Sequence, residues 1–369
     1  MRHLLSIALA LVLASSPPAR ADLLIGQITG LTGPIAASSK ESLAGARLYI
    51  DHVNNKGGVH GEKIELLVLD DKFDPRLSAP HAEELIRQKN VLALFMNRGT
   101  EHIEVILPVM AQHGVPLIAP TSGAMMLRKP VHKLIFNLRA THQREAEKII
   151  AHLKLVGVSS IAVVYVDDAF GLDIMEGVNR GFAEQKLKPL ALIKASRQNP
   201  DIKGIVDQIV QLKPQSMVWI GASAVVSSGV KALRAAGSDV QVLTLSNNAS
   251  SGFIKLLDQQ AHGVIVSQVF PSERNRAYAV IREAQDMARS AGVSDLSPIF
   301  MEGYVGAKLL VEALRRAGPQ PSRASIVKAL DSLRRHDLGG LEISYSPDNH
   351  TGLDYVELSI IGSDGKFKR

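Results

Sequence analysis

The chain has 369 residues, of which 46% are hydrophobic and 4% aromatic, and it carries a formal net charge of +6 with no cysteine. The lack of cysteine excludes disulfides, thiolate metal sites and a cysteine nucleophile. The basic residues are scattered and aromatic residues are few, so no nucleic-acid partner is expected. A chain of this length is sufficient for two domains of ordinary size.

The first 21 residues have the three parts of a secretory signal peptide. Arg2 supplies the positive start, residues 4–14 form an apolar segment, and the small residues Ala19 and Ala21 suit cleavage after Ala21. The apolar segment is too short for a membrane-spanning helix, which needs about 20 residues. We therefore expect an exported protein, and without a cysteine after the leader we expect no lipid anchor.

Apolar runs of strand length then alternate with helical patterns. Strands are predicted at residues 23–28, 64–69, 91–95 and 115–119, and helices at 41–56, 75–89 and 101–113. Strands that are apolar almost throughout, with helices between them, are typical of a parallel sheet covered on both faces. The first half of the mature chain is therefore expected to be an α/β unit.

The same order recurs in the second half of the chain. Strands are predicted at 161–166, 190–194, 217–220 and 240–245, and helices at 169–186, 201–212 and 223–236. Gly114 and Gly237 each end a helix, and the offset between them also relates Thr100 to Ser223. The repeat predicts two similar lobes with a cleft between them. One long doubly wound sheet is the alternative.

In parallel α/β sheets, ligands bind beyond the carboxyl ends of the strands. The corresponding positions are mostly small and hydroxylated, and they lie at residues 97–100, 120–123, 167–170, 221–223 and 246–248. Such residues can bond a polar ligand without filling its space. Helix N-caps favour the same residue types, so that alternative stays open for each of them.

Motifs for catalysis are missing from the sequence. It contains no P-loop, no GxGxxG after a strand, no HExxH and no nucleophile elbow, and the twelve histidines show no metal-ligand spacing. Two acidic pairs, at residues 70–71 and 167–168, are candidates for acid–base work, although acidic residues that close a strand commonly form turns. We expect no enzyme activity, no metal and no cofactor.

Six short motifs follow one another in a specific order. They are residues 30–34 (GLTGP), 45–47 (GAR), 54–61 (NNKGGVHG), 69–75 (LDDKFDP), 114–120 (GVPLIAP) and 168–171 (DAFG). In order and spacing they resemble the periplasmic solute-binding proteins of ABC transporters, in the branched-chain amino acid (leucine/isoleucine/valine) group of type I binding proteins. The resemblance covers essentially all of residues 22–369.

This resemblance implies an α/β fold of two Rossmann-like lobes with parallel sheets and a ligand cleft between them. The chain would cross between lobes three times, near Ala140, near residues 270–271 and near residues 346–354. Lobe 1 would comprise residues 22–140 plus 272–345, and lobe 2 residues 141–271 plus 346–369. The sequence repeat alone does not predict the return of residues 272–345.

The resemblance also implies where a ligand binds. In that family a hydroxyl at the start of the third helix, and hydroxyl and backbone groups after the fourth strand, hold the ligand carboxylate. These positions are Thr100, Thr121, Ser122 and Gly123 here, and the aromatic residue that covers the ligand from the second lobe is Phe170.

The chain departs from that family at two positions. The acidic residue that receives the ammonium of an amino acid corresponds to Ser246, and a first-lobe tyrosine corresponds to Ser38. A buried ammonium without an acidic partner is costly, which favours a ligand that lacks an amine. Arg139 is a candidate partner for a carboxylate, with a salt bridge on the surface or between lobes as the equal alternative. Two further candidate ligand-binding residues are Ser223 and Asn247.

We therefore expect a monomeric periplasmic protein that captures a small organic solute, an amino acid or a carboxylate, by closing its lobes. It would deliver the solute to an inner-membrane ABC permease. One alternative is a ligand-sensing receptor or regulatory module of the same fold. Another is an exported hydrolase, which would need a compact His–Asp/Glu–Ser cluster in the cleft.

Overall fold

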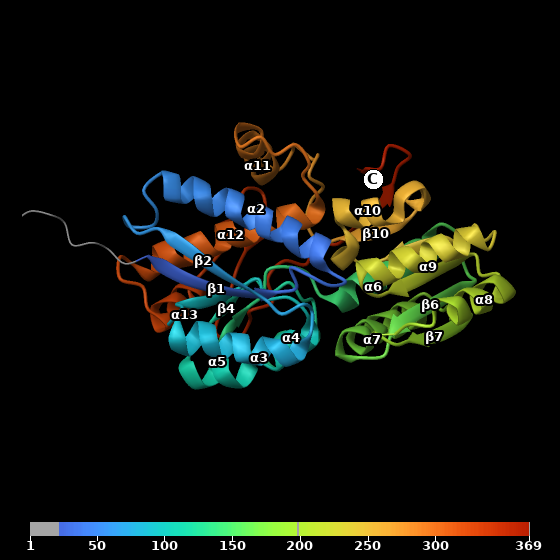
Figure 1. The fold of residues 1–369 in the computed structure, drawn as a ribbon, viewed down its shortest axis with the longest axis horizontal. Helices are drawn as coiled ribbons and strands as arrows, with labels where there is room; N and C mark the ends of the chain where they lie inside the picture. The colour runs from blue at the N-terminus through green and yellow to red at the C-terminus, as the bar shows by residue number, and fades with distance from the viewer. Residues whose placement is uncertain (1–21, 198, 369) are drawn as a thin grey trace, which may run out of the picture.

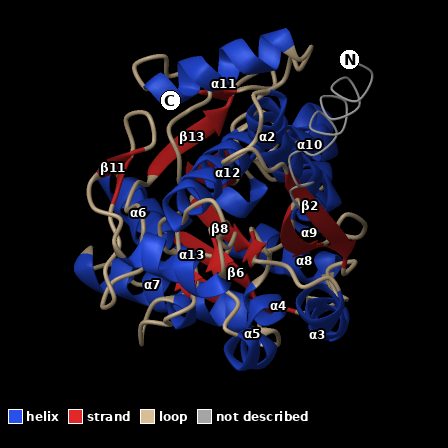
Figure 2. Ribbon diagram, turned by 90° about the vertical axis from the view of Figure 1, so that its left-hand side faces the viewer, coloured by secondary structure: helices blue, strands red, loops and turns tan. Residues whose placement is uncertain are grey.

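The structure is a computed structural model that describes residues 22–197 and 199–368. Two α/β lobes, each built on its own sheet, lie side by side along the long axis of the molecule (Figure 1). In the end-on view helices surround most of the strands (Figure 2). The predicted signal peptide, residues 1–21, lies outside the described residues.

The first sheet has the strand order β2-β1-β3-β4-β5, and all neighbouring strands in it are parallel. Its strands are β1 (Leu23–Thr29), β2 (Ile64–Asp70), β3 (Ala93–Phe95), β4 (Leu117–Ile118) and β5 (Ile135–Phe136). The helices between them are α2 (Ala36–Asn55), α3 (Pro75–Glu83), α4 (Thr100–Glu104) and α5 (Leu107–His113). Leu94 and Phe95 belong to apolar clusters on opposite faces, so both faces of this sheet are covered.

The second sheet has the order β14-β13-β10-β9-β8-β6-β7. Five parallel strands form most of it: β6 (Ile161–Val166), β7 (Ala191–Ala195), β8 (Ser216–Ile220), β9 (Gln241–Thr244) and β10 (Ile265–Gln268). Its helices are α6 (His142–Leu155), α7 (Ala169–Glu184), α8 (Ile202–Leu212), α9 (Ser223–Ala235) and α10 (Ser251–Leu257). The C-terminal strands β13 (Glu357–Ile361) and β14 (Phe367–Lys368) add an antiparallel edge that the repeat did not predict.

The chain crosses three times between the sheets, as the fold class requires. It leaves the first sheet after β5, leaves the second after β10, and returns to the second at β13. Between β10 and β13 it forms α11 (Ala279–Ser290), α12 (Pro298–Ala317), α13 (Arg323–Asp331) and a hairpin of β11 (His336–Asp337) and β12 (Glu342–Ile343). Side chains of this segment share one apolar cluster with β1 and α2 of the first lobe.

Most expected elements are present, and the differences have local causes. The helix expected at residues 101–113 is divided into α4 and α5, and α5 restarts with Pro108 in its first turn. Proline lacks an N–H and disfavours the helical conformation of the residue before it, so a single continuous helix is interrupted there. The helix expected at 41–56 begins earlier, at Ala36. No helix in the described part of the chain has the length and apolarity needed to cross a membrane.

Helices α2 and α12 approach each other closely at two glycines. A Cβ on Gly45 would lie 1.9 Å from the carbonyl oxygen of Phe300, and one on Gly303 would lie 1.9 Å from that of Ser42. Backbone atoms inside helices cannot move aside independently, so any side chain here would force the helices apart. Glycine at both positions therefore allows α12, which belongs to the returning segment, to pack closely against α2 of the first lobe.

We predict that Gly45→Ala lowers the free energy of unfolding by about 1–3 kcal/mol, because the added methyl overpacks this contact. Urea unfolding of the mature protein measures the change. Ala44→Ser, which adds one atom at the exposed neighbouring position, is the control. Equal losses in the two variants would show that the helices do not depend on this approach.

Candidate functional site

A cavity lies between the two lobes, where loops follow the carboxyl ends of strands in both sheets. The first lobe contributes Arg98 and Thr100 after β3, and the second contributes Phe170 after β6 and Asn247 after β9. The cavity has an empty volume of about 520 Å³, including the part open to solvent. Strand ends of two parallel sheets meet here, as expected of a ligand site.

A larger depression, of about 1190 Å³, lies elsewhere, between the α11–α12 region and the C-terminal strands. It is open to solvent, and its lining includes residues such as Arg274, Arg289 and Lys366 rather than the loops at the strand ends. We assign the candidate site to the smaller cavity because buried polar side chains from both lobes converge there.

Three hydroxyl side chains form the polar end of the cavity in the first lobe. The hydroxyls of Thr100 and Ser122 are 3.0 Å apart, and the backbone N–H of Thr121 donates to Asn97 at 3.1 Å. Thr100 is the first residue of α4, and the cap position is Gly99, so the Thr100 hydroxyl does not serve as an N-cap. These hydroxyls are therefore oriented by the protein and line the cavity.

Five of the ten predicted ligand-binding residues line the cavity: Thr100, Thr121, Ser122, Phe170 and Asn247. Three others lie outside it and bond to the protein itself. The hydroxyl of Ser38 donates to the carbonyl of Ile35, that of Ser223 donates to Asn248, and the N–H of Gly123 donates to the His142 imidazole.

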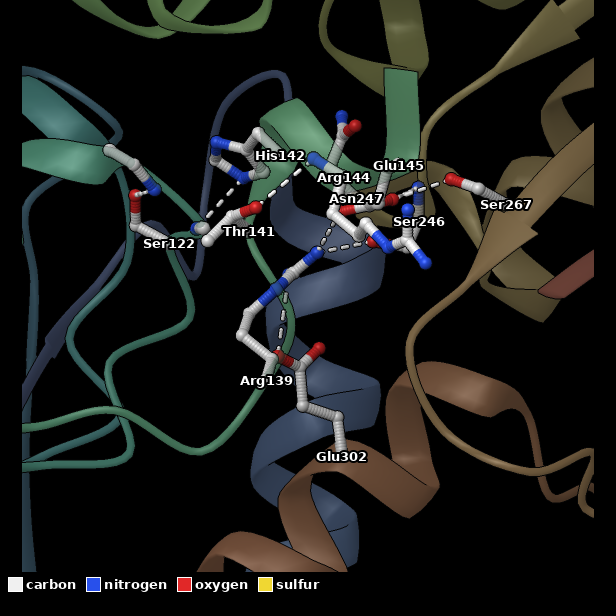
Figure 3. Close-up of polar contacts among 12 residues, drawn as sticks. Ser122, Arg139, Thr141, His142, Arg144, Glu145, Ser246, Asn247, Ser267 and Glu302 are labelled. Carbon is white, nitrogen blue, oxygen red and sulfur yellow. Dashed lines mark hydrogen bonds and ion pairs between the residues drawn. The ribbon is translucent and has the colours of Figure 1, made fainter. Parts of the chain in front are cut away.

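The other two, Arg139 and Ser246, belong to a buried network between the lobes (Figure 3). The Arg139 guanidinium lies 2.6 Å from a Glu145 carboxylate oxygen and 3.4 Å from one of Glu302, and it donates to the Ser246 hydroxyl. The second oxygen of Glu145 accepts from Ser267 and from the backbone of Ser246. Glu145 is in α6 and Glu302 in α12, so the structure shows the interlobe salt bridge rather than an arginine directed at the cavity.

The network shifts the titration of its central carboxylate. Burial alone would raise the pKa of Glu145, but the positive charge of Arg139, followed by His142 and hydrogen bonds from Ser267 and Ser246, lowers it overall. A carboxylate whose pKa is lowered by folding stabilises the folded state above its unfolded pKa, and this stability is lost as the pH falls.

Arg98 is the second buried guanidinium at the lobe interface. Its side chain is 6% exposed, and one nitrogen donates to the carbonyl of Asn247 at 3.2 Å, across the lobes. Burial lowers its pKa to about 10, so it remains charged at neutral pH. In the described part of the chain it forms no ion pair, although it lines the cavity.

Aromatic rings and a cation form a wall of the cavity across the two lobes. Phe73 stacks on His102 with ring centres 4.4 Å apart, and Phe170 meets His142 edge-on at 5.0 Å. The Arg197 guanidinium lies 5.4 Å from the centre of the Phe73 ring and 5.6 Å from that of Phe170. Since Phe73 belongs to the first lobe and Arg197 to the second, this cation–π contact joins the lobes.

Both cavity histidines are neutral at neutral pH, because burial lowers the pKa of His102 and of His142. The His142 Nε2 accepts from the backbone of Gly123, so the proton lies on Nδ1, 3.7 Å from Asp173. Neither histidine is hydrogen-bonded to a hydroxyl, so the Ser–His arrangement of a hydrolase is not formed in this cavity. In residues 22–197 and 199–368 no group of three or more His, Asp or Glu side chains could hold a metal.

Sequence reasoning missed Arg98, Phe73 and Arg197 as individual site residues. Each follows the carboxyl end of a strand, β3, β2 and β7 respectively. Residues 97–100 were expected to line the site, but a charged residue among small ones was not singled out. The rule that ligands bind beyond strand ends, applied to every strand, would have found all three.

We predict that Arg139→Met lowers the free energy of unfolding by roughly 3–5 kcal/mol at pH 7, because it leaves buried carboxylates unpaired. The difference in the free energy of unfolding between variant and wild type should become smaller as the pH falls toward 4. In the variant, Glu145 becomes protonated and no longer carries an unpaired buried charge. In wild type, the stabilisation that comes from the lowered pKa of Glu145 is lost over the same range. Chemical unfolding across this pH range measures it. Lys203→Met, which removes an exposed pair with Asp207, is the control and should leave the free energy of unfolding nearly unchanged, because water screens that pair. A deficit independent of pH would contradict the charge argument.

Comparisons with known proteins agree with this architecture. A family model described as periplasmic binding protein matches residues 23–365. The chain is 22% identical over 336 residues to Leu/Ile/Val-binding protein homolog 3 of Brucella melitensis, with 89% of each chain covered. The crystal structure of a substrate-binding periplasmic protein from Ralstonia solanacearum superposes with a TM-score of 0.86 and 31% identity, covering 94% of this chain and 99% of that one.

A more distant solved structure shows the fold alone. The branched-chain amino acid transporter substrate-binding protein LivJ from Streptococcus pneumoniae, in complex with isoleucine, has a TM-score of 0.83 at 18% identity, covering 94% of this chain and 98% of that one. The two lobes, the crossings between them and the match over residues 23–365 lead to one conclusion. The chain belongs to the periplasmic binding protein family, a family of solute-binding proteins rather than enzymes.

Proposed function

We propose that this protein captures a small organic solute with a carboxylate in the periplasm and delivers it to an inner-membrane ABC permease. The observation that carries the proposal is the cavity to which both lobes contribute polar and aromatic side chains. The family match and the names of relatives as Leu/Ile/Val-binding proteins support a transport role. Residues 1–21 would direct export and be removed in the process, and the mature protein would act as a monomer.

In this proposal the ligand is held by residues of both lobes. Thr100, Thr121 and Ser122 receive the carboxylate in lobe 1, residues 22–140 plus 272–345. Phe170 covers it from lobe 2, residues 141–271 plus 346–369. All four side chains line the one cavity, which supports this division of roles.

Binding would stabilise the closed arrangement of the lobes. Contacts that already join them are the Arg98–Asn247 hydrogen bond, the Arg197–Phe73 cation–π contact, and the Glu41 carboxylate, which accepts from two backbone N–H groups at the start of α10. A ligand that touches both lobes adds to these contacts only when the cleft is closed, so it shifts the population toward closure.

The proposal is tested by a thermal-shift screen of the mature protein against amino acids, aliphatic acids and aromatic acids. A ligand that binds only the folded state raises the melting temperature by mass action. We expect at least one of these small carboxylates to raise it, and co-purification with an ABC permease to distinguish transport from a sensing role. No shift with any compound would contradict the proposal.

We predict that Phe170→Ala weakens binding of the best compound from that screen by about tenfold to a hundredfold, because an aromatic contact surface is lost. Isothermal titration calorimetry measures the change. Leu172→Ala, on the same helix but 49% exposed, is the matched control and should bind as wild type does. An unchanged affinity in Phe170→Ala would exclude Phe170 from the binding site.

A further inference from the structure

We infer that the ligand is an organic acid without an amine, and that its anionic group pairs with Arg98. The inference deepens the proposed function and rests on it, because it specifies the class of solute and the residue that selects it. Its basis is the difference between the two buried arginines at the lobe interface.

Arg139 forms ion pairs with two buried carboxylates, whereas Arg98 forms none among the described residues; Glu302 and Glu41 act on the Arg98 charge only at longer range and do not offset its burial. Arg139 lies beside two buried carboxylates and a hydroxyl. Arg98 is buried to nearly the same extent, yet its one polar side-chain contact in the described structure is a neutral carbonyl. A buried charge without a contacting counter-charge is costly, and Arg98 lines the cavity, so an anion bound there would reduce the cost.

The remaining charges of the cavity do not supply that anion. The Asp168 carboxylate is paired with Arg197 and also caps α7. Among the described residues that line the cavity, Glu101 is the one acid, and it is half-buried and forms no hydrogen bond or ion pair with Arg98. His102 and His142 are neutral at neutral pH because burial lowers the pKa of each.

An ammonium group would therefore enter an unfavourable field. It would lie in the same cavity as the Arg98 guanidinium, which has no ion-pair partner among the described residues, and like charges at close range in a poorly hydrated site repel each other. Hydroxyls and neutral imidazoles offer it no counter-charge. A carboxylate, in contrast, receives a charged donor from Arg98 and hydroxyl donors from Thr100 and Ser122, while Phe73 and Phe170 contact an apolar body.

The test uses compounds that differ only in the amine: L-leucine against 4-methylpentanoate, and L-phenylalanine against 3-phenylpropanoate. Calorimetric titration of the mature protein should show that the amine-free acid of at least one pair binds at least tenfold more tightly than its amino acid. Tighter or equal binding of the amino acid in every pair that binds would overturn the inference while leaving the proposed function intact. Binding of no carboxylate at all would instead contradict the proposed function.

The role of Arg98 is tested separately with the same acid. Arg98→Met should weaken its binding at least tenfold, and Arg98→Lys, which keeps the charge but not the planar fork, should weaken it less. Arg180→Met, which removes a partly exposed arginine, is the control and should bind as wild type does. A circular dichroism spectrum and melting temperature identify any variant that fails to fold, and Arg98→Lys then remains informative. Wild-type affinity in folded Arg98→Met would overturn the assignment.

Discussion

A single buried guanidinium, that of Arg139, joins segments that are far apart in the sequence. Its partners are Glu145 in α6, Glu302 in α12 and Ser246 after β9. Taking three charges out of water is costly, and the cost is offset only if each remaining donor and acceptor is satisfied. The network therefore favours one relative position of the lobes, since Arg139 loses its contacts with Glu145 and Ser246 if the lobes separate at this point.

The position of this network also affects the cavity wall. Arg139 precedes Thr141, whose hydroxyl caps the start of α6, and His142 follows in the first turn. The His142 imidazole accepts from the backbone of Gly123, next to the hydroxyl cluster. The loop after β4 is thus connected to the start of the second lobe. Arg128 adds to this connection, because its guanidinium donates to the carbonyls of both Ser122 and Arg139.

Much of the fold could be predicted from the sequence because the strands are buried on both faces. The strand expected at 161–166 has those bounds in the structure, and all six of its residues are buried. The return of α12 to the first lobe could not be predicted from local patterns, since it depends on a contact between Gly45 and a helix more than 250 residues later. The family resemblance led us to expect the end of the chain in the second lobe, but the antiparallel pairing of β13 with β10 was not expected.

The candidate site was predictable in position but not in detail. Alignment with a family identifies where a residue lies along the chain, and two of the residues that it singles out, Thr100 and Phe170, line one cavity. It does not say whether a polar group is already satisfied by the protein. That distinction separates Arg139 from Arg98: both are buried and charged, but only the first is in direct contact with carboxylates.

The most direct test of this account is a crystal structure of the mature protein with its tightest-binding small carboxylate. We expect the carboxylate oxygens within about 3.2 Å of the Arg98 guanidinium, with the body of the ligand between Phe73 and Phe170 and the Arg139 network unchanged. A ligand whose carboxylate lies away from Arg98, or which carries an ammonium paired with Glu101, would contradict the account.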